Sequence, residues 1–177
     1  MKHSRNIFAN MASPRSIATL IMALFCMSTI AAADEPVYTM ITMIDVANGA
    51  EVVAGKYEQA VEKITAKKGA VDAFSYNTNL CVAYTKLGDI ENASLACEAA
   101  IEEASSIRVV RQSEFSRSFQ RHTKKKYLAF ALSNRGVLRA AMGDVELARQ
   151  DFVEALTVNT RISAAKINLA RLIGSEA

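Results

Sequence analysis

The residues that could do covalent chemistry are few, and the cysteines come first among them. The chain of 177 residues has three cysteines, and Cys26 lies in a leader-like N-terminal segment. Cys81 and Cys97 remain, and an even count in an exported chain favours a disulfide. The alternative is two small, buried hydrophobic side chains. No C-x-x-C motif is present, so we do not expect a redox enzyme.

Acid–base and metal chemistry have even less support in the sequence. His122 is the only histidine beyond the leader-like segment, and it stands in a run of Lys and Arg. A lone histidine forms neither a metal cluster nor a catalytic triad. The carboxylates of Glu58 and Glu62 and of Glu102 and Glu103 fit a helix surface, and no glycine-rich phosphate loop exists. The sequence therefore predicts no enzyme and no cofactor.

Residues 1–33 have the order of a secretory signal peptide. Lys2, Arg5 and Arg15 supply its only charges, 17–30 is an apolar run, and three alanines end at Ala33. The run is short for a membrane span, which needs about 20 residues. We expect cleavage after Ala33 and a periplasmic or secreted protein. An uncleaved N-terminal anchor is the alternative.

Charge is distributed unevenly along the remaining chain. Residues 34–103 contain 5 basic and 12 acidic residues, whereas 104–177 contain 13 basic and 6 acidic ones. These sum to zero, so overall charge does not favour nucleic acid as a partner. The two halves should form an electrical dipole that can orient a charged partner, or that serves only solubility.

Apolar periodicity predicts a helical hairpin over residues 131–156. Leu132, Val137, Leu138 and Met142 recur at helical steps before Gly143, which suits the residue after a helix end. A second apolar stripe follows, and Asp144 could cap its helix. Glycine within a helix costs about 1 kcal/mol relative to alanine, so Gly136 indicates a close approach, with Ala148 as its expected neighbour.

These residues resemble the tetratricopeptide repeat, a helix–turn–helix unit of about 34 residues. The small Gly136, the Gly143-Asp144 turn, and Ala148, Phe152, Ala155 and Leu156 follow the family pattern, whereas Arg135, Arg139 and Thr160 depart from it. A second copy has its turn at Gly88-Asp89, a weaker one has its turn at Gly55-Lys56, and Asn168 marks a further first helix.

The resemblance implies an all-α solenoid of about three repeats plus a C-terminal capping helix, over residues 47–173. It places Cys81 and Cys97 facing inward across one repeat. Residues 34–46 would form an N-terminal arm, in which Val37–Asp45 fits an extended segment or the start of a helix equally well.

The resemblance also implies a concave groove lined by the first helices. Asparagine offers both a donor and an acceptor, so it can hold an extended peptide backbone, or alternatively bridge helices. We therefore expect a non-enzymatic scaffold of the cell envelope that binds a protein or peptide. The expected groove residues are Asn79, Asn134, Asn168, Val82, Val137, Thr78, Ser133 and Phe130.

Residues 105–126 insert a basic segment between two repeats. Phe115, Phe119 and His122 would share a face if the segment were helical from Ser113. The segment could bind anionic lipid head groups, an acidic protein or a nucleic acid, of which the nucleic acid is least expected in an exported protein. It could equally be a solvated connection or an N-terminal extension of the next helix. Its cations are Arg108, Arg111, Arg117, Arg121, Lys124, Lys125 and Lys126.

Overall fold

Seven α-helices make up the regular structure of the part of the chain that the computed structural model describes, residues 37–108 and 113–175. No strand occurs in these residues, so the all-α prediction is confirmed. The predicted signal peptide at 1–33 lies outside the described residues, as does Arg111. The helices are α1 (Gly49–Val53), α2 (Tyr57–Thr65), α3 (Ala73–Leu87), α4 (Ile90–Ser106), α5 (Glu114–Ala141), α6 (Val145–Val158) and α7 (Ser163–Gly174).

Short polar signals set the helix ends. The Asp72 carboxylate accepts a hydrogen bond from Ser75 N at 2.8 Å and caps α3, and the Ser113 hydroxyl caps α5 through Ser116 N. Gly143, at φ 82°, occupies the left-handed conformation in the turn after α5. The side chain of Asp144 makes no capping bond to α6, which corrects the prediction for that residue.

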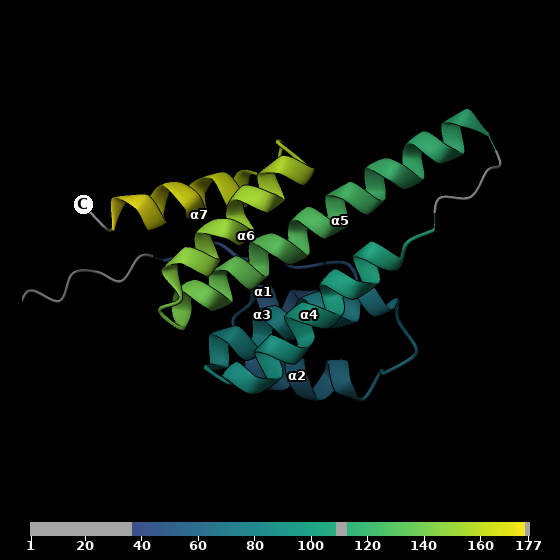
Figure 1. Cartoon of the computed structure of the whole chain (residues 1–177). Helices are drawn as coiled ribbons and strands as arrows, with labels where there is room; N and C mark the ends of the chain where they lie inside the picture. The colour runs from purple at the N-terminus through teal and green to yellow at the C-terminus, as the bar shows by residue number, and fades with distance from the viewer. Residues whose placement is uncertain (1–36, 109–112, 176–177) are drawn as a thin grey trace, which may run out of the picture. The chain divides into compact units, whose positions relative to one another are not determined.

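Neighbouring helices in the chain pack against each other, α3 with α4 and α5 with α6 most extensively (Figure 1). In addition, α3 contacts α1 and α5, and α5 contacts α7. The first helices of successive pairs therefore lie in a row. None of the helices in 37–108 and 113–175 is long and apolar enough to span a membrane.

The basic insertion does not form a separate element. Residues 114–126 are the N-terminal half of α5, a helix of 28 residues, so the sequence alternative of a helix extension is the one observed. Figure 1 shows this half of α5 projecting beyond the ends of its neighbours. The C-terminal half is the buried partner of α6, and its buried residues begin at Ala129.

Candidate functional site

Three buried asparagines hold an extended segment of the chain by its backbone. The Asn168 side chain accepts from Thr39 N and donates to Thr39 O, both at 2.8 Å. Asn134 does the same for Ile41, at 2.7 and 2.8 Å, and Asn79 for Met43, at 2.8 and 3.0 Å. We call Asn79, Asn134 and Asn168 the asparagine ladder. All three side chains are fully buried.

The spacing of the bonded residues follows from extended geometry. Backbone groups of alternate residues in an extended chain point the same way, so Thr39, Ile41 and Met43 can all face the ladder. The three asparagines come from α7, α5 and α3, so residues 37–43 run across the row of first helices. This resolves the ambiguity over Val37–Asp45: residues 37–43 are an extended arm and not a helix.

Apolar side chains of the arm fill the space beside the ladder. The Tyr38 ring lies 6.4 Å from the Phe152 ring, centroid to centroid. Met40 packs against both the α1–α4 core and the core between α5, α6 and α7, while Ile41 and Met43 contact clusters around α5. The Arg171 guanidinium donates to Val37 O and to Thr39 Oγ1. The arm thus contributes to several hydrophobic cores.

A tight turn connects the arm to α1. Asn79 Nδ2 also donates to Val46 O at 3.0 Å and Ala47 O at 3.1 Å. Ala47 and Asn48 have φ of 48° and 55°, a left-handed conformation that costs a non-glycine residue some strain. A Cβ on Gly49 would lie 2.0 Å from Met43 O, so only glycine allows the chain to return this closely. Gly49 and the Asn79 side-chain amide therefore fix the position of the C-terminal end of the arm.

The other residues expected to line an open groove are covered. Val82, Val137, Thr78 and Ser133 are buried, and Phe130 is partly buried. Tyr38 and Met40 of the arm pack in the same cluster as Val137, and Met43 packs against the same cluster as Phe130, so the arm makes contacts that the sequence analysis expected a partner to make. The hydroxyls of Thr78 and Ser133 are buried and have no hydrogen-bond partner in the structure.

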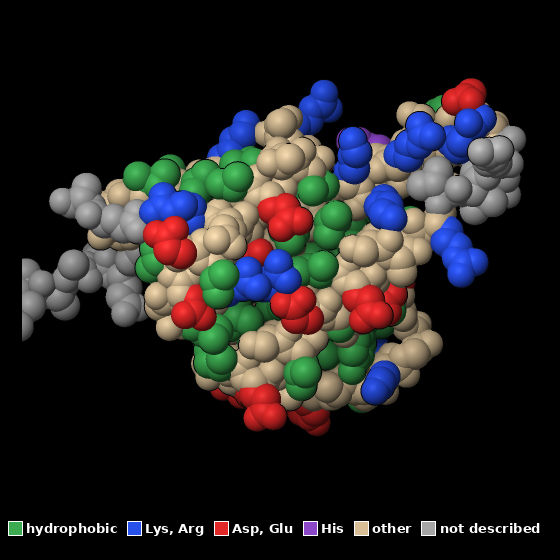
Figure 2. Space-filling view, viewed as in Figure 1, with side chains coloured by type: hydrophobic (Ala, Val, Ile, Leu, Met, Phe, Trp, Pro, Cys, Tyr) green, Lys and Arg blue, Asp and Glu red, His purple; other side chains and the backbone are tan. Residues whose placement is uncertain are grey.

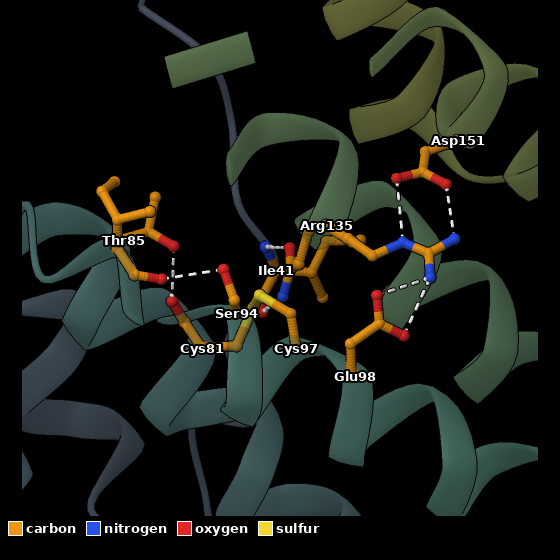
Figure 3. Close-up of a disulfide and its surroundings, with 10 residues drawn as sticks. Ile41, Cys81, Thr85, Ser94, Cys97, Glu98, Arg135 and Asp151 are labelled. Atoms are coloured by element: carbon orange, nitrogen blue, oxygen red, sulfur yellow. Dashed lines mark hydrogen bonds and ion pairs between the residues drawn. A yellow bond between two sulfur atoms is a disulfide. The ribbon is translucent and has the colours of Figure 1, made fainter. Parts of the chain in front are cut away.

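A disulfide pair links α3 to α4. The sulfur atoms of Cys81 and Cys97 lie 2.04 Å apart, and both residues are buried in the core (Figure 3). The predicted pairing is therefore present. Gly136 in α5 and Phe152 in α6 occupy the corresponding positions of the next helical pair, each 55 residues after one of the two cysteines. A Cβ on Gly136 would lie 2.6 Å from the Phe152 ring, so the nearest side chain to this glycine belongs to Phe152, one turn further along α6 than the expected Ala148.

A buried ion cluster joins α5 to α6 and α4. Asp151, whose side chain is 2% exposed, accepts from Arg135 Nη2 at 2.7 Å and Nε at 3.0 Å, and from Arg139 Nη1 at 2.9 Å. Arg135 Nη1 also bonds Glu98 at 2.9 Å (Figure 3). Burial alone would lower the pKa of Arg135, but Asp151 and Glu98 together raise that pKa above its usual range.

The sequence pattern contained part of the signal for this cluster. Arg135 and Arg139 were noted as departures from the repeat, although their partner Asp151 was not. Two cations at inward positions of one helix require an inward anion on its partner, because unpaired buried charge is costly. Asp151 follows Arg135 by 16 residues, the same separation as that between Cys81 and Cys97.

The basic half of α5 is largely exposed. Phe115 and Phe119 have 82% and 64% of their surface accessible, and Arg121, His122, Lys125 and Lys126 are also exposed. Other predicted cations are engaged: Arg117 pairs with Glu114 at 2.5 Å, and Lys124 Nζ donates to Ser105 O at 2.6 Å. Arg108 is exposed beside the end of α4. Figure 2 shows basic side chains gathered over the projecting end of α5.

The described residues contain no group of three or more His, Cys, Asp or Glu that could hold a metal ion. Comparisons with protein-family models, with curated proteins and with solved structures found no match to this chain.

Proposed function

We propose that this protein is a non-enzymatic interaction scaffold of the cell envelope, built from tetratricopeptide-like helical pairs. Its asparagine ladder would bind an extended segment of a partner protein in place of the arm. The observation that supports this most is the chemistry of the ladder. Each asparagine bonds to both the N–H and the C=O of one arm residue, and these bonds do not involve that residue's side chain.

The ladder bonds only backbone groups, so selectivity must come from the side chains of the bound segment. In the arm, Tyr38 and Met40 pack against the cluster that contains Phe152, and Ile41 and Met43 pack against two other clusters. A replacing segment would therefore be extended and rich in bulky apolar residues. Peptide recognition by main-chain hydrogen bonds, with pockets for alternate side chains, is a recurring mode in proteins.

Tethering favours the resident arm. A segment on a short tether has an effective concentration in the millimolar range, so a free peptide competes poorly until the arm is weakened. Proline lacks the N–H that the ladder accepts. Thr39→Pro with Ile41→Pro should therefore release the arm, whereas Thr39→Ala with Ile41→Ala removes the same side chains and keeps both donors.

Binding of a fluorescent peptide of residues 37–45 to these full-length variants tests the proposal. The double-proline variant should bind the peptide at least about tenfold more tightly than the double-alanine control. Adding Asn134→Ala to the proline variant should abolish the gain. A proline variant that remains helical by circular dichroism and binds no peptide would contradict the proposal. If the proline variant unfolds, peptide binding is instead compared between Arg171→Ala and the wild type. Arg171→Ala removes only the contacts at the N-terminal end of the arm, at Val37 and Thr39.

A further inference from the structure

The projecting half of α5 presents an amphipathic surface that the groove does not use. Phe115 and Phe119 are one helical turn apart, and both side chains are largely exposed to solvent. His122 and Lys126 continue the same line, each three or four residues on, and both are exposed. Bulky apolar rings on a charged, exposed helix face have a cost in water, because their surface remains hydrated.

Several cations share the N-terminal half of α5 with these rings. Among residues 113–126, Glu114 is the only acidic side chain, and it is paired with Arg117. Arg121 and Lys125 are exposed, and neither side chain has a hydrogen bond or ion pair to another residue within 37–108 and 113–175. Lys126 Nζ lies 5.4 Å from the centroid of the Phe130 ring, a cation–π contact.

A hollow of about 430 Å³ lies at the base of this helix half. His122, Lys126 and Arg161 border it, and Phe130, Ile162 and Ala164 supply apolar walls. A second hollow beside it, of about 270 Å³, is bordered by Lys125 and Arg161 as well. The surface therefore combines exposed rings at its outer end with cationic recesses at its base.

We propose that the projecting half of α5 docks on an anionic lipid surface. Phe115 and Phe119 would enter the boundary between head groups and acyl chains, as the apolar face of an interfacial helix does. Arg121, Lys125, Lys126 and Arg161 would contact lipid phosphates. Basic residues near an anionic bilayer each add attraction that decays within a Debye length, so the contact weakens with salt. An acidic protein would use the same cations but would not require the two exposed rings.

The absence of tryptophan from the chain allows a local measurement. Phe115→Trp and Phe119→Trp in the full-length chain each place one fluorophore on the proposed surface. Leu95→Trp is the matched control, because Leu95 is 66% exposed and belongs to α4 and not to the basic half of α5. Each variant is mixed with phosphatidylglycerol–phosphatidylcholine vesicles and with pure phosphatidylcholine vesicles, at low and high salt. Because the readout is local, contact made by residues 1–33 does not mimic it.

We expect a blue shift and reduced acrylamide quenching at positions 115 and 119 with the anionic vesicles at low salt. The Leu95→Trp signal should not change. In the Phe119→Trp variant, adding Arg121→Ser and Lys125→Ser should weaken vesicle binding at least about tenfold, whereas Lys67→Ser with Lys68→Ser should not.

Three results would overturn the proposal. One is no spectral change at 115 or 119 with anionic vesicles. Another is an equal change with neutral vesicles, which would leave no role for the cations. The third is binding of a polyglutamate peptide that requires Arg121 and Lys125 while the vesicles give no shift, because the surface would then be a protein-docking site.

Discussion

Two helical pairs in this molecule share one spacing but differ in what joins them. In α3–α4 the equivalent core positions hold Leu80, Tyr84 and Ala96, with a disulfide between Cys81 and Cys97. In α5–α6 the corresponding residues, 55 positions on, are Arg135, Arg139 and Asp151, with Gly136 against Phe152. The α3–α4 interface is apolar and is crosslinked by a disulfide. The α5–α6 interface contains an ion cluster and a close contact between Gly136 and the Phe152 ring. The helix geometry therefore tolerates very different chemistry across one interface.

Removing the anion should have the largest effect. Asp151→Ala leaves two guanidinium groups without their buried partner, and breaking a buried pair in this way costs about 3–5 kcal/mol. Because Arg135 and Arg139 keep 16% and 23% of their side-chain surface exposed, we expect about 3 kcal/mol. Urea denaturation followed by circular dichroism measures this loss.

The converse change sharpens the comparison. Arg135→Leu, Arg139→Tyr and Asp151→Ala together give α5–α6 the apolar residues of α3–α4. Replacing a buried ion pair by packed apolar groups is often close to neutral. The triple variant should therefore lose less than half of the stability lost by Asp151→Ala alone. A larger loss in the triple variant would show that the ion cluster stabilises the fold beyond mutual charge compensation.

Opening the disulfide should have an effect of similar size to Asp151→Ala. A bridge across a 16-residue separation stabilises a protein by about 3 kcal/mol, mainly by restricting the unfolded chain. Cys81→Ala with Cys97→Ala should lower the free energy of unfolding by about that amount in urea. Reductant should produce a similar loss in the wild type and none in the variant. Equal stability with and without reductant in the wild type would contradict this prediction.

Gly136→Ala should have a smaller effect with a definite sign. The new Cβ would meet the buried Phe152 ring at 2.6 Å, and overpacking costs about 1–3 kcal/mol, partly offset by a helix-propensity gain of about 1 kcal/mol. We expect a net loss of about 1 kcal/mol by urea denaturation. Gly174→Ala, where a Cβ would meet nothing within 4 Å, is the control and should not destabilise. Phe152→Leu should reduce the cost of Gly136→Ala if the ring is its cause.

The first pair, α1–α2, is joined by an ion pair at the surface. Removing this ion pair should have the smallest effect of the changes considered. Lys63 Nζ lies 2.8 Å from Glu51 Oε1, and this hydrogen bond is the main reason that the pKa of Glu51 falls from 4.5 to about 2. A lowered carboxyl pKa stabilises the fold above pH 4.5, and that contribution disappears as the pH falls from 4.5 through 2. Lys63→Met should return the pKa of Glu51 toward 4.5 in an NMR titration, whereas Lys67→Met should leave it near 2.

The sequence predicted the helical pairs and the cysteine pairing because both depend on local spacing. For Asn79, Asn134 and Asn168 it left two roles open, bonding to an extended backbone or bridging helices, and the structure shows the first. It did not predict that the backbone would be the chain's own, because Asn168 and Thr39 are 129 residues apart and no local pattern links them. Asp151 was missed for a similar reason: its partners lie on another helix, and periodicity describes only one helix at a time.

Amide hydrogen exchange in the arm tests the central claim most directly. The N–H groups of Thr39, Ile41 and Met43 donate to buried asparagine oxygens, whereas those of Met40 and Thr42 donate to no other residue that the structure describes. Exchange measured by NMR should therefore alternate along the arm, slower by about a hundredfold at residues 39, 41 and 43 than at 40 and 42. Equally fast exchange at all five amides would show that the ladder does not hold the arm.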